Sequence, residues 1–312
     1  MSPVTAVTVR VPAKVNLQLA VGPVRADGYH DLVTVFHAVA LFDEVTVSPA
    51  ARDSVTITGE GAGRVPTDDS NLAVRAARAV AEVAGPASRD TPGLAIRIRK
   101  RIPVAAGLAG GSADAAATLV ACNELWRAGL GQPELAELAA GLGSDVAFTL
   151  VGGTAIGMGR GERVTPALAS GTYHWVLAFA QDGLSTVEVY AACDRLRAAG
   201  SGDAHRPTLD TALMTALRSG DPAGLGPLLA NDLQAAAISL RPELRRTLAA
   251  GVEFGALGAM VCGSGPTCAF LAKSARHARD LAVALAGAGV CRTVARVTGP
   301  AAGAGVLAVA RP

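Results

Sequence analysis

The chain has 312 residues, a length that suggests two domains at about 150 residues each. Half of the residues are hydrophobic, which excludes an intrinsically disordered chain, and 36 are glycine, which is above the usual share. The formal net charge of +2 is too small for a protein that binds nucleic acid through bulk electrostatics, so we expect no nucleic-acid partner.

The mean hydropathy of +0.36 raises the question of a membrane span. The longest stretch without an ionised residue, Phe254–Ala272, contains several glycines and Pro266, which would break a helix inside a bilayer. The N-terminus shows no apolar core of a signal peptide. The five cysteines form no CxxC pair, which indicates reduced thiols. We therefore expect a soluble, cytoplasmic protein without a membrane partner, either a monomer or a weak homodimer.

Hydrophobic periodicity divides the first half into strands followed by helices. Alternation at a period of two predicts strands at Val4–Val11, Val15–Val21, Thr34–Val47, Val55–Thr58 and Leu94–Arg99. An apolar face and a preceding cap predict a helix at Asn71–Ala84, and an initial proline with a following glycine predicts one at Pro133–Leu142. Between them, a glycine-rich segment runs into a further predicted helix that ends at Trp126. The apolar run Val146–Ile156 is predicted as a further strand.

The second half is predicted to be α+β. Its border with the first half is expected near Gly152–Gly161 and Pro166–Thr172, which gives domains of residues 1–165 and 166–312. The predicted elements are strands at His174–Ala180 and Thr293–Val297, a hairpin at Leu257–Leu271, and helices at Val187–Ala199, Leu209–Ser219, Pro242–Gly251 and Ser274–Ala286. The Ala/Gly-rich tail Ala301–Ala310 is the segment most similar to a linker.

The most unusual segment is Pro103–Ala113, between a predicted strand and a predicted helix. Its glycines allow a ligand to approach the backbone closely, and the free N–H groups at the start of a helix favour an anion. We therefore predict a phosphate site, although a tight turn without a ligand fits the same residues. The loop lacks both the Gly-Lys-Ser/Thr of a Walker A motif and the GxGxxG spacing of a dinucleotide fingerprint.

Lysine is rare, because Lys14, Lys100 and Lys273 are the only lysines among 28 basic residues. Where arginine is the usual cation, a lysine is expected at positions that need its compact ammonium group. The five histidines show no metal-ligand spacing, so no metal held by the protein alone is expected.

The glycine loop resembles the phosphate-binding motif of the GHMP kinase superfamily, written P-x-x-x-G-L-G/A-G/S-S-S/A. Two further motifs of that superfamily are matched in order, by Pro12–Leu17 and by Cys262–Thr267. Ala26–His30 and Gly143–Val146 are similar to one branch whose substrate carries a cytidine diphosphate. The resemblance implies an N-terminal ribosomal-protein-like domain, a C-terminal ferredoxin-like domain and a site in the cleft between them.

The resemblance also implies phosphoryl transfer from ATP, with Mg²⁺ as its counter-ion, to a hydroxyl of a small molecule. Asp145 is expected to accept or orient the hydroxyl proton, and Lys14 to keep Asp145 ionised. The expected ATP-binding residues are Pro103, Val104, Ala105, Ala106, Gly107, Leu108, Ala109, Gly110, Gly111, Ser112 and Ala113, with Asn71 and Lys100 around the adenine. The expected contacts to the cytidine-diphosphate substrate are Asn16, Tyr29, His30, Thr186 and Tyr190.

The residues alone leave other interpretations open. Asp145 suits an ordinary turn, Lys100 suits an exposed cation, and Tyr190 shares a helical spacing with Val187 and Asp194 that is equally typical of a core position. Ser112 matches a metal-binding serine of the superfamily, but no clear partner glutamate is found. The alternative functions are a kinase for homoserine or a sugar, and a non-catalytic protein that binds a nucleotide or RNA.

Overall fold

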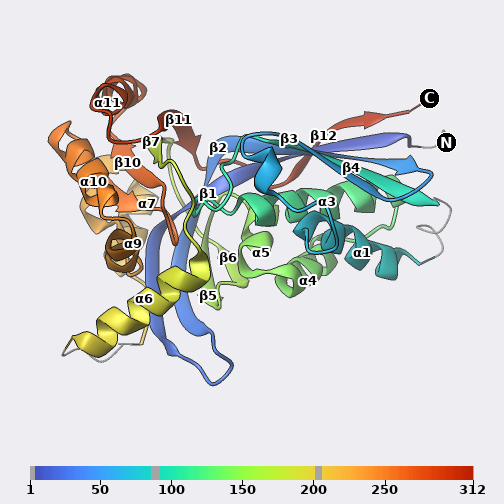
Figure 1. Cartoon of the computed structure of the whole chain (residues 1–312), viewed down its shortest axis with the longest axis horizontal. Helices are drawn as coiled ribbons and strands as arrows, with labels where there is room; N and C mark the ends of the chain where they lie inside the picture. The colour runs from blue at the N-terminus through green and yellow to red at the C-terminus, as the bar shows by residue number, and fades with distance from the viewer. Residues whose placement is uncertain (1–3, 86–91, 201–205, 312) are drawn as a thin grey trace.

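The computed structural model describes residues 4–85, 92–200 and 206–311, and Figure 1 shows them in two halves. Two long antiparallel strands, β1 (Ala6–Val24) and β2 (His30–Ala50), dominate the first half. Their alternating valines turn one face inward, since Val7, Val9 and Val11 are fully buried. The sheet order is β12–β1–β2–β4–β3, with β5 and then β6 extending from β2. Its other strands are β3 (Ser54–Gly59), β4 (Gly93–Lys100), β5 (Thr154–Gly159), β6 (Arg163–Pro166), β8 (Ala230–Asn231) and β12 (Gly305–Ala310).

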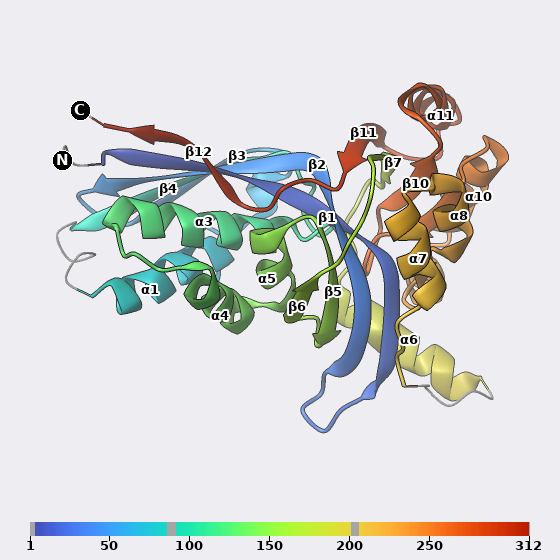
Figure 2. The same cartoon turned by 180° about the vertical axis from the view of Figure 1, so that it is seen from behind.

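Four helices cover one face of this sheet in both views of the molecule (Figures 1 and 2): α1 (Leu72–Ala84), α3 (Gly110–Trp126), α4 (Gln132–Leu142) and α5 (Ser144–Val151). α3 lies at the centre and is rich in alanine, and most of its residues are buried around its whole circumference. Small side chains allow β1, α1 and α5 to pack against it from different sides.

The second half contains a four-stranded antiparallel sheet in the order β11–β7–β10–β9. Its strands are β7 (Tyr173–Phe179), β9 (Gly258–Val261), β10 (Cys268–Ala272) and β11 (Thr293–Gly299). Its helices are α6 (Thr186–Ala199), α7 (Thr211–Ser219), α8 (Pro222–Leu225), α9 (Gln234–Leu240), α10 (Glu243–Glu253) and α11 (Ala275–Gly287). α10 and α11 pack on one face of this sheet, while Trp175 and Leu177 on the other face join the core of the first half.

The two halves are linked through the ends of the chain. β12 pairs antiparallel with β1, which places Val309 beside Val7, and the two termini lie side by side in both views (Figures 1 and 2). The first sheet therefore contains a strand from residues 305–310. Apart from this strand, the division into domains near residue 165 stays a prediction.

Two predicted elements are wrong. The segment Val146–Ile156 is not one strand, because residues 144–151 form α5 and only 154–159 form a strand. A short apolar run suits a buried helix as well as a buried strand, and here Gly152, with a φ of 69°, ends the helix. The tail Ala301–Ala310 is not a linker: its largely exposed strand β12 is held by backbone pairing with β1. β1 also runs without a break through both strands predicted between residues 4 and 21.

The predicted α+β class is confirmed, together with the helices and strands expected in the second half. Within residues 4–85, 92–200 and 206–311, no helix combines the length and the apolar character that crossing a bilayer requires.

Candidate active site in a cavity between the two halves

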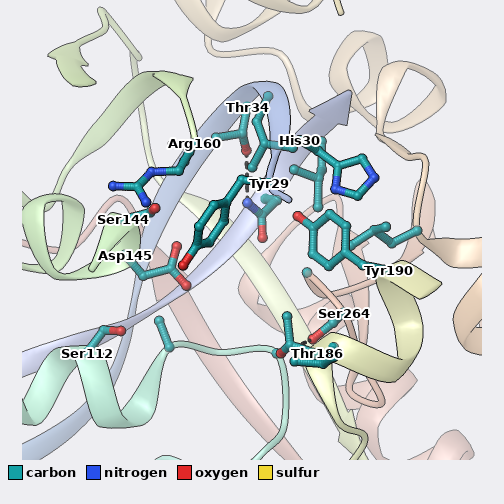
Figure 3. A pocket seen from close by; sticks show the side chains of 18 of the residues that line it. Tyr29, His30, Thr34, Ser112, Ser144, Asp145, Arg160, Thr186, Tyr190 and Ser264 are labelled. Atoms are coloured by element: carbon teal, nitrogen blue, oxygen red, sulfur yellow. Dashed lines mark hydrogen bonds between the residues drawn. The ribbon is translucent and has the colours of Figure 1, made fainter. Parts of the chain in front are cut away.

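A cavity of about 710 Å³ lies where the first sheet, the glycine loop and α6 meet. Its lining comes from β1 and β2, the loop before α3, the start of α5, the turn after β5, α6 and the turn between β9 and β10 (Figure 3). These segments span most of the chain. The site therefore exists only when both halves are folded together.

The loop Pro103–Ala109 presents the first turn of α3 to this cavity. Ala105, Gly107 and Ala109 have φ values of 53°, 76° and 62°, a left-handed backbone that folds the loop tightly. No side chain caps the start of α3, whereas Asn71 caps α1 and Ser185 caps α6. The N–H groups of the first turn of α3 are thus left for an anion, at the positive end of the helix dipole.

The turn between β9 and β10 approaches this loop closely. A Cβ atom on Gly107 would lie 2.0 Å from the carbonyl oxygen of Cys262, so only glycine fits there. A Cβ atom on Gly263 would lie 3.0 Å from the Lys14 Nζ atom. The three sequence motifs, 12–17, 103–113 and 262–267, therefore meet at one place.

Lys14 and Asp145 lie next to each other beside the first turn of α3. The Lys14 Nζ atom is 3.7 Å from the Asp145 Oδ2 atom and donates a hydrogen bond of 2.7 Å to Asn16 Oδ1. Asn16 in turn donates to the Thr34 hydroxyl at 2.8 Å, and that hydroxyl donates to the Gln18 carbonyl at 2.7 Å. Register shifts in β1 flank the Lys14 segment, and such bulges re-aim side chains next to sites.

Burial separates the two charged groups. Lys14 is only 4% exposed, whereas the Asp145 side chain is 33% exposed to the cavity. Asp145 stands in the first turn of α5, whose dipole favours a negative charge at that position. The pair is thus a buried ammonium held by a hydrogen bond to Asn16, beside a carboxylate that a ligand in the cavity can reach.

Aromatic and polar side chains form the other end of the cavity. His30 is 2.9 Å from Asp194 Oδ1, and its ring centroid is 5.0 Å from that of Tyr190. Tyr29 is 54% exposed and projects into the cavity opposite Tyr190 (Figure 3). Burial, and then the charge of Asp145, raises the pKa of the Tyr190 hydroxyl, so it stays neutral. A flat ring between these groups would be stacked and hydrogen-bonded.

Most residues predicted from the sequence lie together in this cavity. Its lining includes Lys14, Asn16, Tyr29, His30, Asp145, Thr186 and Tyr190, and from the glycine loop Ala105, Ala106, Gly107, Ala109, Gly110, Gly111 and Ser112. The Thr186 hydroxyl is also hydrogen-bonded, at 3.0 Å, to the Ser264 hydroxyl in the turn between β9 and β10. Four loop residues, Pro103, Val104, Leu108 and Ala113, lie outside the lining, and Leu108 and Ala113 are core residues.

The predicted adenine contacts, Lys100 and Asn71, also lie outside the lining. Asn71 caps α1, accepting from the Ala73 N–H at 2.8 Å, so its side chain is already hydrogen-bonded. Lys100 is not an exposed cation: its buried ammonium donates to Asp43, to Asp114 and to the Gly110 carbonyl. Both side chains have structural partners, and their contact with ATP stays a prediction.

The ion cluster of Lys100, Asp43 and Asp114 lies directly beneath the glycine loop. Burial raises the pKa of Asp114 to about 8, and the nearby ammonium only partly offsets this. Burial opposes the charge on Lys100, but the two carboxyl groups outweigh it and raise its pKa. The ammonium is thus retained and holds the start of α3 to the end of β4.

Sequence reasoning missed several cavity residues, including Arg160, Asp194 and Ser264. Arg160 stands between two glycines in the stretch that suggested only a domain border. The helical spacing of Val187, Tyr190 and Asp194 is real, and all three residues line the cavity, while Tyr190 also packs against the core of the second half. The charged Asp194, within an otherwise apolar helical stripe, could have indicated that this face of the helix lines a site.

Two family models match the chain. The GHMP kinase N-terminal domain matches residues 71–153, and the GHMP kinase C-terminal domain matches residues 213–291. The first match contains the glycine loop and Asp145, and the second contains the turn that covers this loop. The fold and the site thus define the class of GHMP kinases.

Proteins of one specificity within this class are similar to nearly the whole chain. A 4-diphosphocytidyl-2-C-methyl-D-erythritol kinase of Nocardia farcinica is 59% identical, with 96% of each chain covered. Its counterpart in Thermobifida fusca is 56% identical over 98% of this chain and 100% of the relative. A crystal structure of 4-(cytidine 5'-diphospho)-2C-methyl-D-erythritol kinase has a TM-score of 0.74 at 36% identity, covering 93% of this chain and 98% of that one. The chain therefore belongs to the 4-diphosphocytidyl-2-C-methyl-D-erythritol kinase family of GHMP kinases.

Proposed function

We propose that this chain transfers a phosphoryl group from ATP to the 2-hydroxyl of 4-diphosphocytidyl-2-C-methyl-D-erythritol, in the non-mevalonate route to isoprenoid precursors. Relatives with that name are 56–59% identical over nearly the full chain. The observation that carries the proposal is the Lys14–Asp145 pair, 3.7 Å apart and beside the uncapped first turn of α3.

The residues present fit a nucleoside triphosphate with its metal ion. The start of α3 offers N–H groups without a side-chain cap, and Ser112 lines the cavity with its hydroxyl. Among the described residues no three His, Cys, Asp or Glu side chains gather to form a metal cluster. We infer that Ser112 would supply a protein oxygen to the Mg²⁺ ion of MgATP, and that the bound ion would neutralise phosphate charge.

The chemistry assigned to the protein is to position the two reactants and to take up a proton. The hydroxyl oxygen forms a bond to the γ-phosphorus while the bond from that phosphorus to the β-γ bridging oxygen breaks and ADP leaves. Asp145 accepts the hydroxyl proton, since its carboxylate is open to the cavity. Lys14 stabilises negative charge on the attacking oxygen, and Asn16 holds its ammonium in place.

The other end of the cavity suits the cytosine. We infer that the base lies between Tyr29 and Tyr190, with His30 hydrogen-bonded to its edge. Asp194 holds the imidazole of His30 at 2.9 Å and thereby sets its orientation. Thr186, at the start of α6, lines the cavity, and we infer that it contacts the nucleoside.

We also place the enzyme in the cytoplasm. All five cysteines are free thiols, and four of them are buried. Burial raises the pKa of Cys193, so that this thiol stays protonated and unreactive at neutral pH. Thiols of this kind are typical of a reducing compartment.

An acceptor panel tests the proposed function. ADP release would be measured with MgATP and the diphosphocytidyl substrate, homoserine, mevalonate or galactose as acceptor. We expect turnover with the diphosphocytidyl substrate and at least a hundredfold lower kcat/KM with the others, because these leave the polar groups at the aromatic end unpaired. Efficient turnover of a non-nucleotide alcohol, with none of the diphosphocytidyl substrate, would reject the proposal.

A further inference from the structure

The cavity contains one strong cation that the proposed mechanism leaves unused. Of its lysine and arginine side chains, Lys14 is held by Asn16 and Asp145. The other is Arg160, whose guanidinium forms no ion pair with a carboxylate of the described residues. Its charge is therefore available to a ligand in the cavity.

The local backbone fixes where Arg160 stands. It occupies the turn between β5 and β6, flanked by Gly159 with a φ of 75° and Gly161 with a φ of 100°. The Gly161 N–H donates to the Met158 carbonyl at 3.0 Å, which closes the turn. The Arg160 N–H donates to a Glu162 carboxylate oxygen at 2.6 Å, so that this acid binds the backbone and not the guanidinium. This short, closed turn fixes the backbone position from which the Arg160 side chain extends.

The guanidinium lies over an aromatic ring at the predicted base end of the site. The Arg160 Cζ atom is 4.6 Å from the centroid of the Tyr29 ring, a cation–π contact that holds the guanidinium against this ring. In Figure 3 Arg160 is drawn on the Ser144 side of Tyr29, and His30 and Tyr190 on the other side. Arg160 thus lies on the side of Tyr29 that faces Ser144, whose neighbour in the chain is Asp145, and both Arg160 and Asp145 line the cavity.

We propose that Arg160 binds the diphosphate of the substrate and thereby selects alcohols linked to a nucleoside diphosphate. The inference rests on the proposed function: with the base at Tyr29 and the hydroxyl at Asp145, the diphosphate must cross the space between them. A planar guanidinium matches phosphate oxygens with two parallel hydrogen bonds, which an ammonium does not. The cation–π contact with Tyr29 preorganises the guanidinium for these hydrogen bonds.

The test compares two inhibitors that differ only in the phosphates. Binding of CDP and of cytidine would be measured by titration calorimetry in the wild type and in the variants Arg160→Gln and Arg160→Lys. We expect Arg160→Gln to weaken CDP binding roughly 10- to 100-fold and cytidine binding less than threefold, as loss of a charged hydrogen-bond donor implies. Arg160→Lys should recover part of the loss. Arg163→Gln, at an exposed position three residues on, is the matched control.

The outcomes separate this inference from the proposed function. If wild-type enzyme turns over the diphosphocytidyl substrate but Arg160→Gln weakens CDP and cytidine equally, Arg160 only supports the Tyr29 ring and the inference fails. A raised KM for ATP with unchanged CDP binding would assign Arg160 to the nucleotide donor and would also overturn it. A wild type that binds neither CDP nor cytidine would reject the proposed function as well.

Discussion

At the scale of single residues, the proposed chemistry depends on a partly exposed carboxylate, Asp145, beside a buried ammonium, Lys14. Asp145→Asn keeps the shape of the side chain but removes its ability to accept a proton. We expect kcat to fall by roughly 10²- to 10⁴-fold, with a much smaller change in KM, because general-base transfer contributes about that much. Steady-state kinetics measures both constants. Glu137→Gln, on an exposed face of α4, is the control, and an Asp145→Asn enzyme with full kcat would remove the assigned role.

The buried cluster under the glycine loop allows a second prediction. Lys100→Met leaves the buried Asp43 carboxylate without its cation, which should lower the free energy of unfolding by about 3–5 kcal/mol. Asp114→Asn should lower it by less, about 1–3 kcal/mol, because the Lys100 ammonium keeps Asp43 as its partner. Urea unfolding measures both variants. A fully stable Lys100→Met protein with a raised KM for ATP would instead support the adenine contact.

The residues of the site differ in whether their neighbours could be predicted from the sequence. Lys14 and Asn16 are two apart on a predicted strand, so their shared face followed from the period of the strand alone. The partners of Lys100 lie 57 and 14 residues away in the chain. No local sequence pattern predicts such an ion cluster. Arg160 was equally hidden, because a turn carries no periodicity from which the direction of a side chain follows.

At the scale of elements, the close contact between two glycine turns is the critical packing feature. Gly107→Ala would place a methyl group against the Cys262 carbonyl and would force alanine to a φ of 76°. We expect a loss of about 1–3 kcal/mol in the free energy of unfolding and roughly a tenfold rise in the KM for ATP, because the loop must move. Thermal unfolding and ATP kinetics measure the two effects.

The control for this change is Gly141→Ala in α4. A Cβ atom there meets nothing within 4 Å, and the substitution should stabilise the helix by up to about 1 kcal/mol. If Gly107→Ala behaved like this control in both measurements, the two turns would not constrain each other.

Elements differ in how far the sequence predicted them. Amphipathic helices such as α1 and α10 and the alternating strands β1 and β2 were predicted, because one face meets the core and the other meets water. The prediction for the α5 segment was wrong, because five of its eight residues are buried and a continuous apolar run shows no periodicity. β12 was missed because its pairing with β1, about 300 residues earlier, supplies the hydrogen bonds that its small side chains do not suggest.

At the scale of the whole molecule, His37 connects the two halves. It is fully buried on β2, bonds to Thr154 at 2.8 Å and packs against Tyr173 and Trp175 of the second sheet. Burial lowers its pKa to about 3, so the folded protein keeps the imidazole neutral. Between about pH 6.5 and 3 the unfolded chain binds a proton that the folded chain does not. The contribution of His37 therefore lowers the free energy of unfolding as the pH falls through this range, by up to about 1.4 kcal/mol per pH unit.

The pH dependence of urea unfolding measures this effect. The His37→Asn variant, whatever its stability at pH 7, should lose less stability between pH 6.5 and 4.5 than the wild type does. His174→Asn, at a half-buried position on β7, is the matched control and should keep the wild-type slope. Parallel curves for wild type and His37→Asn would show that this imidazole does not carry the acid sensitivity.

The central claim concerns where the phosphoryl group goes, and ³¹P NMR of the product tests it most directly. Wild-type enzyme, MgATP and the diphosphocytidyl substrate should give ADP and one new phosphomonoester in equal amounts. The 2-hydroxyl is tertiary and its carbon bears no hydrogen, so the ester signal should show no three-bond coupling to a proton. A proton-coupled signal would place the phosphate on another hydroxyl, and ADP without any ester would show hydrolysis; either result would contradict the account.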